Sequence, residues 1–226
     1  MAELTVSEAL QKRISTRAFL DTPVSQDQIR ELLDEARFAA SGGNVQPWHV
    51  RVVAGEARQR VIDAVHKKLA ENPLENEARF PVYPEKLWDP YRSRRFEVGE
   101  DMYALMGVPR EDKAARFAHL LKNYEFFGAP LGLFFAIDEQ MNENQWAHLG
   151  MFMMSLALAA EAKGLASCMQ EAWTPHAKTV AEVLGVEAPL IIYCGMALGY
   201  ADPDAKINQL RSKRAPVDEF ATFEGF

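Results

Sequence analysis

The sequence has little cysteine and no recognisable export signal, and both shortages exclude classes of protein. Only two cysteines, Cys168 and Cys194, occur in 226 residues, and no histidine stands at metal-ligand spacing from either one. We therefore expect two reduced core thiols rather than a disulfide framework or a metal site. The N-terminal residues lack the basic and apolar regions of a signal peptide, so the expected location is cytoplasmic.

Long apolar runs and an excess of positive charge are also missing. The most apolar stretch, residues 149–160, is bounded by His148 and Glu161, and a bilayer crossing needs about 20 apolar residues. Lys and Arg number 25 against 32 Asp and Glu, which gives a formal net charge of −7. Phosphate binding along a nucleic acid needs a basic surface. We therefore expect neither a membrane nor a nucleic acid as partner.

What the sequence does contain is an ordinary globular pattern of helices and strands. Two capping boxes, Thr5 with Glu8 and Ser25 with Gln28, predict helix starts, and apolar periodicity predicts the other elements. The expected helices cover 5–13, 26–40, 57–70, 113–127, 144–163 and 175–184, and the expected strands cover 48–54, 131–137 and 190–198. This order predicts an α+β fold in which helices surround a modest sheet.

Two segments show no clear period within the single domain that we expect over residues 1–226. Residues 72–99 hold four prolines among several aromatic residues. Prolines break regular elements whereas aromatic rings favour burial, so this segment is either a lid or a packed surface insertion. The polar tail, about residues 200–226, is expected to wrap a partner subunit.

Two clusters of cations are candidates for binding an anion. Arg13, Ser15 and Arg17 lie within five residues, and the planar fork of arginine donates two hydrogen bonds to a phosphate at once. The alternative is a solvated pair at a helix end. Arg211, Lys213 and Arg214 form a second cluster in the tail, which could equally be a solvated basic run.

Two connecting segments are candidates for holding a ring. In residues 41–48 two glycines permit close backbone approach, and Asn44 and Gln46 offer both donors and acceptors. Residues 164–173 are expected to form a turn between helices that aims backbone N–H groups at a ligand. A plain turn and a simple connector are the respective alternatives.

In this order, the segments resemble the FMN-dependent nitroreductase family. The resemblance rests on an Arg-x-Ser-x-Arg motif, Ser-x-x-Asn-x-Gln-Pro-Trp about 25 residues later, Gly-Leu-x-Ser-Cys-x-x-Glu, the strand at 195–200 and a final Arg-x-Pro. It covers roughly residues 8–218. The segment 124–130 and the aromatic insertion are similar to the branch associated with nitrobenzoate reduction.

The resemblance implies a mainly antiparallel sheet, a domain-swapped homodimer and two non-covalent FMN sites at the subunit interface. It implies that one protomer binds FMN through its cation clusters, with Arg211 or Lys213 as second tail cation, and through a turn facing flavin N5. The other protomer would contribute the segment near residue 44. The implied FMN-binding residues are Arg13, Ser15, Arg17, Ser41, Gly42, Asn44, Gln46, Gln170, Glu171, Ala172, Arg211 and Arg214.

The expected reaction is a ping-pong transfer of hydride from NADH or NADPH to a nitroaromatic, quinone or related small acceptor. The flavin carries the hydride, so no side chain is assigned a catalytic role, and no metal is expected. Tyr124, Phe126 and Phe127 are expected to select the acceptor. An arginine group at 92–95 either attracts a carboxylate on the substrate or is a solvated stretch. Reductive dehalogenation, enone reduction and non-catalytic FMN binding are the alternatives.

Overall fold

The structure is a computed structural model, and it describes residues 4–73 and 75–226. The α-helices are α1 (Val6–Lys12), α2 (Gln26–Ala36), α3 (Gly55–Glu71), α4 (Tyr91–Leu105), α5 (Lys113–Leu121), α6 (Glu143–Ala162) and α7 (Ala177–Leu184). The strands are β1 (His49–Ala54), β2 (Leu131–Asp138), β3 (Ala166–Gln170) and β4 (Leu190–Gly199). Short 3₁₀ turns are η1 (Gly42–Asn44), η2 (Lys122–Gly128), η3 (Glu171–His176), η4 (Lys206–Gln209) and η5 (Val217–Glu219).

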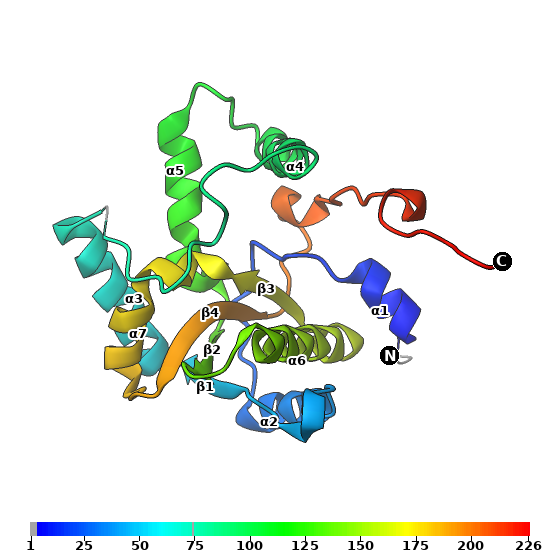
Figure 1. Cartoon of the computed structure of the whole chain (residues 1–226). Coiled ribbons are helices and arrows are strands. Elements are labelled where there is room, and N and C mark those ends of the chain that lie inside the picture. Colours follow the sequence, from blue (N-terminus) through cyan, green and yellow to red (C-terminus); the bar gives the residue numbers. More distant parts are fainter. Residues whose placement is uncertain (1–3, 74) are drawn as a thin grey trace.

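The four strands form one antiparallel sheet with the order β1-β2-β4-β3. Helices cover both faces, as Figure 1 shows, so the expected α+β class is confirmed. Strand β2 lies inside the sheet and its residues Leu131–Ile137 are buried. Burial on both faces explains why this strand reads as a continuous apolar run rather than an alternating one.

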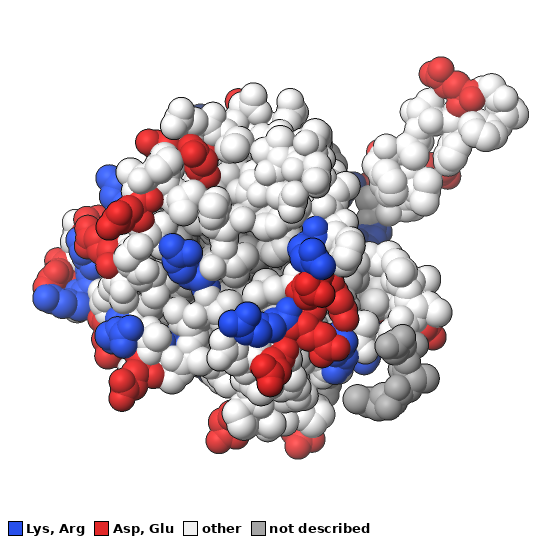
Figure 2. All heavy atoms as spheres, turned by 90° about the horizontal axis from the view of Figure 1, so that it is seen from below, with Lys and Arg blue, Asp and Glu red and all other residues white. Residues whose placement is uncertain are grey.

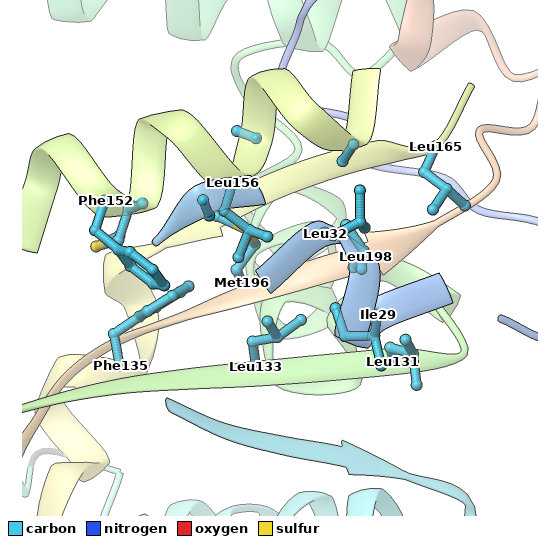
Figure 3. Packing of buried hydrophobic residues seen from close by; sticks show 14 of the residues in the cluster. Ile29, Leu32, Leu131, Leu133, Phe135, Phe152, Leu156, Leu165, Met196 and Leu198 are labelled. Atoms are coloured by element: carbon cyan, nitrogen blue, oxygen red, sulfur yellow. The ribbon is translucent and has the colours of Figure 1, made fainter. Parts of the chain in front are cut away.

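One face of the sheet packs against α2 and α6. Leu133 and Phe135 of β2 point toward Leu156 and Phe152 of α6 in Figure 3, and Leu32 of α2 joins the same cluster. The rings of Trp48 and Phe152 stack with centroids 4.8 Å apart. Each fully buried leucine or phenylalanine contributes about 1.5–3 kcal/mol relative to exposure, so this cluster holds the long helix firmly on the sheet.

The other face packs against α3, α7 and the turns η2 and η3. Phe134 of β2, Phe126 and Trp173 are buried together, and the Phe126 and Trp173 ring centroids lie 4.7 Å apart. The sheet makes room for these rings with glycine. A Cβ on Gly132 would lie 2.3 Å from the Phe126 ring, and one on Gly195 would lie 2.5 Å from Cδ1 of Trp173.

The segment 164–173, expected to be a turn, contains the edge strand β3. It pairs with β4 in the register Ala166 with Gly199 through Gln170 with Gly195. The strand is only five residues long, so its alternation was too brief to be recognised from periodicity. A turn follows it at Glu171–His176.

The prediction of an irregular segment over 72–99 was also wrong in part, because α4 begins at Tyr91. None of its residues is buried, so it has no apolar stripe for a periodicity argument to detect. Two expected helices are shorter than predicted. The helix over 26–40 ends at Ala36, and the helix over 113–127 ends at Leu121, after which Phe126 and Phe127 adopt positive φ angles of 54° and 53°.

Helices α4 and α5 stand above the sheet in Figure 1, and the C-terminal segment runs past α4 and away from the body. The side chains of Arg94 in α4 and Glu219 in the tail form an ion pair at 2.6 Å. The view from below in Figure 2 shows acidic and basic side chains interspersed on that face, with the tail projecting to the right. Within the described part of the chain, no helix is long and apolar enough to span a membrane.

Candidate active site

The Arg13–Arg17 segment is held between the edge of the sheet and the tail. Its backbone bridges to β3, where the Thr16 amide donates to the Ser167 carbonyl at 3.0 Å. On its other side, the Arg17 amide donates to Oδ1 of Asn208 at 2.9 Å. Nδ2 of Asn208 donates to the Ala18 carbonyl at 2.8 Å. Asn208 therefore ties the start of the chain to the segment that leads into the tail cations.

This arrangement brings together the two cation clusters, which are about 200 residues apart in the sequence. A cavity of about 670 Å³ is lined by Arg13, Ser15, Arg17, Arg211, Lys213 and Arg214, together with residues of α4. Among the described residues, no carboxylate lies within ion-pair distance of these four arginines. Lys213 differs, because its ammonium group pairs with Glu97 of α4.

The cavity has the chemistry of an anion site. Nε of Arg13 is buried without a hydrogen-bond partner among the described residues, and a buried unsatisfied donor is destabilising. An Nη atom of Arg211 donates to the carbonyls of Asn208 and Leu210, and one of Arg214 donates to both oxygens of Ser212. These bonds orient the guanidinium groups but leave their charge uncompensated. A phosphate in this cavity would compensate the charge of the guanidinium groups.

The turn after β3 is fixed by buried side chains. Gln170 is 1% exposed; its Nε2 donates to the Asn123 carbonyl at 2.8 Å, and its Oε1 accepts from Nε1 of Trp173 at 3.2 Å. Glu171 is exposed and accepts a hydrogen bond from the Tyr193 hydroxyl at 3.3 Å. The Gln170 amide group is therefore fully used inside the protein, and its role is to hold the backbone at Glu171 and Ala172.

A second cavity, of about 640 Å³, lies against this turn. Gln170, Glu171 and Ala172 line it with Tyr124, and Met153 and Met169 supply apolar wall. Tyr83 and Arg95 line both this cavity and the cationic one, so the two cavities adjoin. The combined site offers cations at one end and an apolar, ring-sized space at the other.

The loop at Ser41–Gln46 lies elsewhere on the protomer and lines neither cavity. Gly42, Asn44 and Gln46 are exposed, and Asn44 and Gln46 have positive φ angles of 56° and 52°. The Gln46 amide donates to the Ser41 hydroxyl at 3.0 Å, and the Gly42 amide donates to Nε2 of His148 at 3.4 Å. The loop is thus a shaped, exposed surface rather than part of this protomer's cavities.

Phe126 and Phe127 are placed in the core, contrary to the expectation that they select the acceptor. Their side chains are 0% and 6% exposed and belong to the core cluster on the face of the sheet that packs against α3 and α7. Their left-handed backbone turns the rings inward, where Phe126 packs on Trp173. Of the three residues assigned to the acceptor, only Tyr124 lines the second cavity. Burial raises the pKa of the Tyr124 hydroxyl, so it stays protonated at neutral pH.

Several residues of the site could not be recognised from sequence. Asn208 clamps the Arg13–Arg17 segment from a tail without periodicity, and Asn123 accepts the Gln170 hydrogen bond from within a 3₁₀ turn. Tyr193 contacts Glu171 of the site from β4, a strand whose apolar sequence predicts a place in the core. Only the tertiary structure gives these residues a role. No cluster of three or more possible metal ligands occurs among the residues that the structure describes.

Comparison with known proteins agrees with this architecture. Residues 10–200 match the family model described as "Nitroreductase family". The chain is 36% identical over 217 residues to the 4-nitrobenzoate reductase of Pseudomonas putida, covering 95% of this chain and 93% of that protein.

Two solved structures are similar over nearly the whole chain. The FMN and NADPH-dependent nitroreductase NfnB of sphigopyxis sp. strain HMH has a TM-score of 0.96 and 42% identity, covering 99% of this chain and 100% of that one. The FMN-dependent nitroreductase NfnB of Mycobacterium smegmatis, in complex with NADPH, has a TM-score of 0.90 and 32% identity, covering 96% and 97%. The chain belongs to the nitroreductase family.

Proposed function

We propose that this protein is an FMN-dependent oxidoreductase that uses NADPH or NADH to reduce nitroaromatic compounds. The observation that carries the proposal is the joined pair of cavities, with uncompensated arginines in one and the Gln170–Ala172 turn in the other. Relatives named for nitroaromatic reduction, including the nitrobenzene nitroreductase of Ectopseudomonas oleovorans at 30% identity over 96% of this chain, support the acceptor class.

The residues present fit FMN. Arg13, Arg17 and Arg214 would bind the phosphate, and the Ser15 hydroxyl would donate to the same end of the cofactor. Arg211 is the better second tail cation, because Lys213 is already paired with Glu97. At about 0.3 kcal/mol per heavy atom, a ligand the size of FMN gains about 9 kcal/mol, which corresponds to a sub-micromolar dissociation constant. The binding is non-covalent.

Around the ring, this chain's residues position and shield rather than transfer protons. The backbone at Glu171 and Ala172, fixed by Gln170, would face the flavin, while Met153, Met169 and Tyr124 would exclude water from the acceptor space. When bound, FMN supplies a two-electron carrier that takes hydride from a reduced nicotinamide and passes it to the acceptor. The same space would hold donor and acceptor in turn, which predicts ping-pong kinetics.

The proposed active form of the protein is a domain-swapped homodimer in the cytoplasm. Ser41, Gly42, Asn44 and Gln46 would complete the site of the partner subunit, and their exposure away from this protomer's cavities supports that arrangement. The tail would wrap the partner, which its exposed phenylalanines support. Cys168 and Cys194 are buried and unpaired, which fits a reducing compartment.

The test is a visible spectrum of the purified protein under anaerobic conditions. A flavin band that bleaches on adding NADPH or NADH, and returns on adding 4-nitrobenzoate or nitrobenzene, is the expected result. A band that neither nucleotide bleaches would instead favour a non-catalytic flavin carrier. A protein that retains no flavin after loading with excess FMN and desalting would overturn the cofactor assignment.

A further inference from the structure

The arginines of α4 differ in whether their charge is already paired. The guanidinium of Arg92 lies 2.7 Å from the Asp89 carboxylate, and that of Arg94 lies 2.6 Å from the Glu219 carboxylate. For Arg95, no carboxylate of the described residues lies within ion-pair distance. Its guanidinium carbon lies 4.3 Å from the centroid of the Tyr83 ring. Stacking on Tyr83 positions the Arg95 fork without neutralising it.

Arg95 and Tyr83 stand at the junction of the two cavities, since both residues line each one. Among the described residues that line the cavity beside the Gln170–Ala172 turn, two are charged, the cation Arg95 and the anion Glu171. Most of the remaining wall is apolar, with Leu120 and Met153 among the lining residues. The cavity is therefore polarised, with an apolar space for an aromatic ring and a single cation to receive a negative group.

We propose that Arg95 binds the carboxylate of the acceptor, so that the enzyme prefers nitroaromatic carboxylates over neutral nitroaromatic compounds. This inference rests on the proposed function and narrows its substrate class. An aromatic carboxylate would pair its charge with Arg95 and place its ring against the apolar lining residues. A neutral acceptor gains only the apolar contact, so Arg95 is a specificity residue rather than part of the electron-transfer machinery.

The experiment compares 4-nitrobenzoate with 4-nitrobenzamide, a neutral acceptor of nearly the same shape. The wild-type holoenzyme is expected to have a higher kcat/KM for 4-nitrobenzoate. Arg95→Gln is expected to lower the benzoate-to-benzamide ratio of kcat/KM by about tenfold or more, the scale of a lost charge-assisted hydrogen bond. Arg92→Gln makes the same change of charge on the same helix and is expected to leave the ratio unchanged.

Binding without turnover provides an independent readout. Benzoate and benzamide, which carry no nitro group, are titrated calorimetrically into the oxidised FMN-loaded enzyme. Arg95→Gln is expected to weaken benzoate binding and not benzamide binding, and the benzoate preference of the wild type is expected to fall as salt screens the exposed guanidinium. Arg95→Lys, which retains the charge but not the planar fork, is expected to be intermediate, and it also serves if Arg95→Gln does not fold.

Other outcomes would overturn the inference. An unchanged benzoate-to-benzamide ratio in Arg95→Gln, with both compounds still reduced, removes the role of Arg95 and leaves the proposed function intact. The same unchanged ratio with a raised KM for NADPH assigns Arg95 to a phosphate of the nucleotide, and a lowered FMN content assigns it to the cofactor. A wild-type holoenzyme that reduces neither compound rejects the proposed function and the inference together.

Discussion

At the scale of single residues, the site is characterised by arginine charges that have no carboxylate partner among the described residues. Arg13, Arg17, Arg211 and Arg214 face a common cavity, and Nε of Arg13 is buried without a hydrogen-bond partner in the described structure. Such groups lower the stability of the folded protein when no ligand is bound, and an anionic ligand that pairs with them stabilises it. Stability and cofactor binding are therefore linked at these residues.

Arg17→Glu is predicted to raise the dissociation constant for FMN by at least about tenfold, because it replaces a charge-assisted donor with a repelling carboxylate. The measurement is a fluorescence titration of FMN with the apoprotein. Arg60→Glu makes the same charge reversal at an exposed position of α3 and is expected to leave the affinity near the wild-type value. Equal affinities for wild type and Arg17→Glu would contradict the assignment of Arg17 to the phosphate end.

His119 illustrates a second kind of residue effect, on stability rather than on binding. Burial, and then the charges of Lys122 and Arg17, lower the pKa of its imidazole to about 4, against about 6.5 in an unfolded chain. The unfolded state therefore takes up a proton first as the pH falls. The stability that neutral His119 provides is complete above pH 6.5 and is lost progressively toward pH 4.

His119→Leu is predicted to reduce the loss of unfolding free energy between pH 6.5 and pH 4 relative to the wild type. The side chain lies between Tyr103 and Phe127, and its Nε2 has no described partner, so an apolar replacement suits the site. Urea unfolding at several pH values measures the difference. His66→Leu makes the same change of side chain at an exposed position of α3 and serves as the control. Parallel profiles for wild type and His119→Leu would refute this prediction.

At the scale of secondary-structure elements, glycines in two strands allow aromatic rings to pack directly on the sheet. Gly195 of β4 faces Trp173, and Trp173 in turn holds Gln170 at the end of β3. The packing of η3 on the sheet thus positions the turn at Glu171 and Ala172. The site geometry depends on a close contact between a strand and a 3₁₀ turn.

Gly195→Ala is predicted to destabilise the protein by about 1–3 kcal/mol, because the added methyl group overlaps the fully buried Trp173 ring. Gly99→Ala provides the matched control, since a Cβ there meets nothing within 4 Å in the helix α4. That change is expected to be stabilising by up to about 1 kcal/mol. Denaturant unfolding of both variants tests the pair, and an unchanged midpoint for Gly195→Ala would show that Trp173 relaxes freely.

At the scale of the whole molecule, the described chain leaves several large apolar side chains exposed to solvent. Phe220, Phe223 and Phe226 in the tail are 71%, 63% and 105% exposed, and Phe38 after α2 is 78% exposed. Apolar side chains gathered on a projecting segment are typical of an interaction surface. The proposed homodimer provides a second copy of the chain to cover them.

Replacing Phe220, Phe223 and Phe226 together by alanine is predicted to raise the dissociation constant of the dimer by at least about tenfold, since each ring buried at an interface contributes about 1.5–3 kcal/mol. Sedimentation velocity over a range of protein concentrations measures the constant. A triple leucine variant keeps apolar side chains at these positions and is expected to remain close to wild type. A dimer that is unaffected by the alanine changes would show that the tail does not hold the subunits together.

The sequence alone determined the α+β class, most element positions and the family, because these depend on local capping, apolar period and short motifs. The capping boxes at Thr5 and Ser25 occur where predicted. It could not reveal β3, which is too short to show a period, or α4, which buries nothing. It also placed Phe126 and Phe127 at the site, because side-chain direction depends on a left-handed backbone that the motif does not encode.

The tertiary structure decided which charges share a cavity and which are already neutralised. Asn208 joins two cation clusters from opposite ends of the chain. Arg92, Arg94 and Lys213 form ion pairs, whereas Arg95, which lines the acceptor space, has no carboxylate partner among the described residues. These relations arise from contacts between residues far apart in sequence, whose strength depends on distance and burial. A linear pattern specifies the residue types but not those distances.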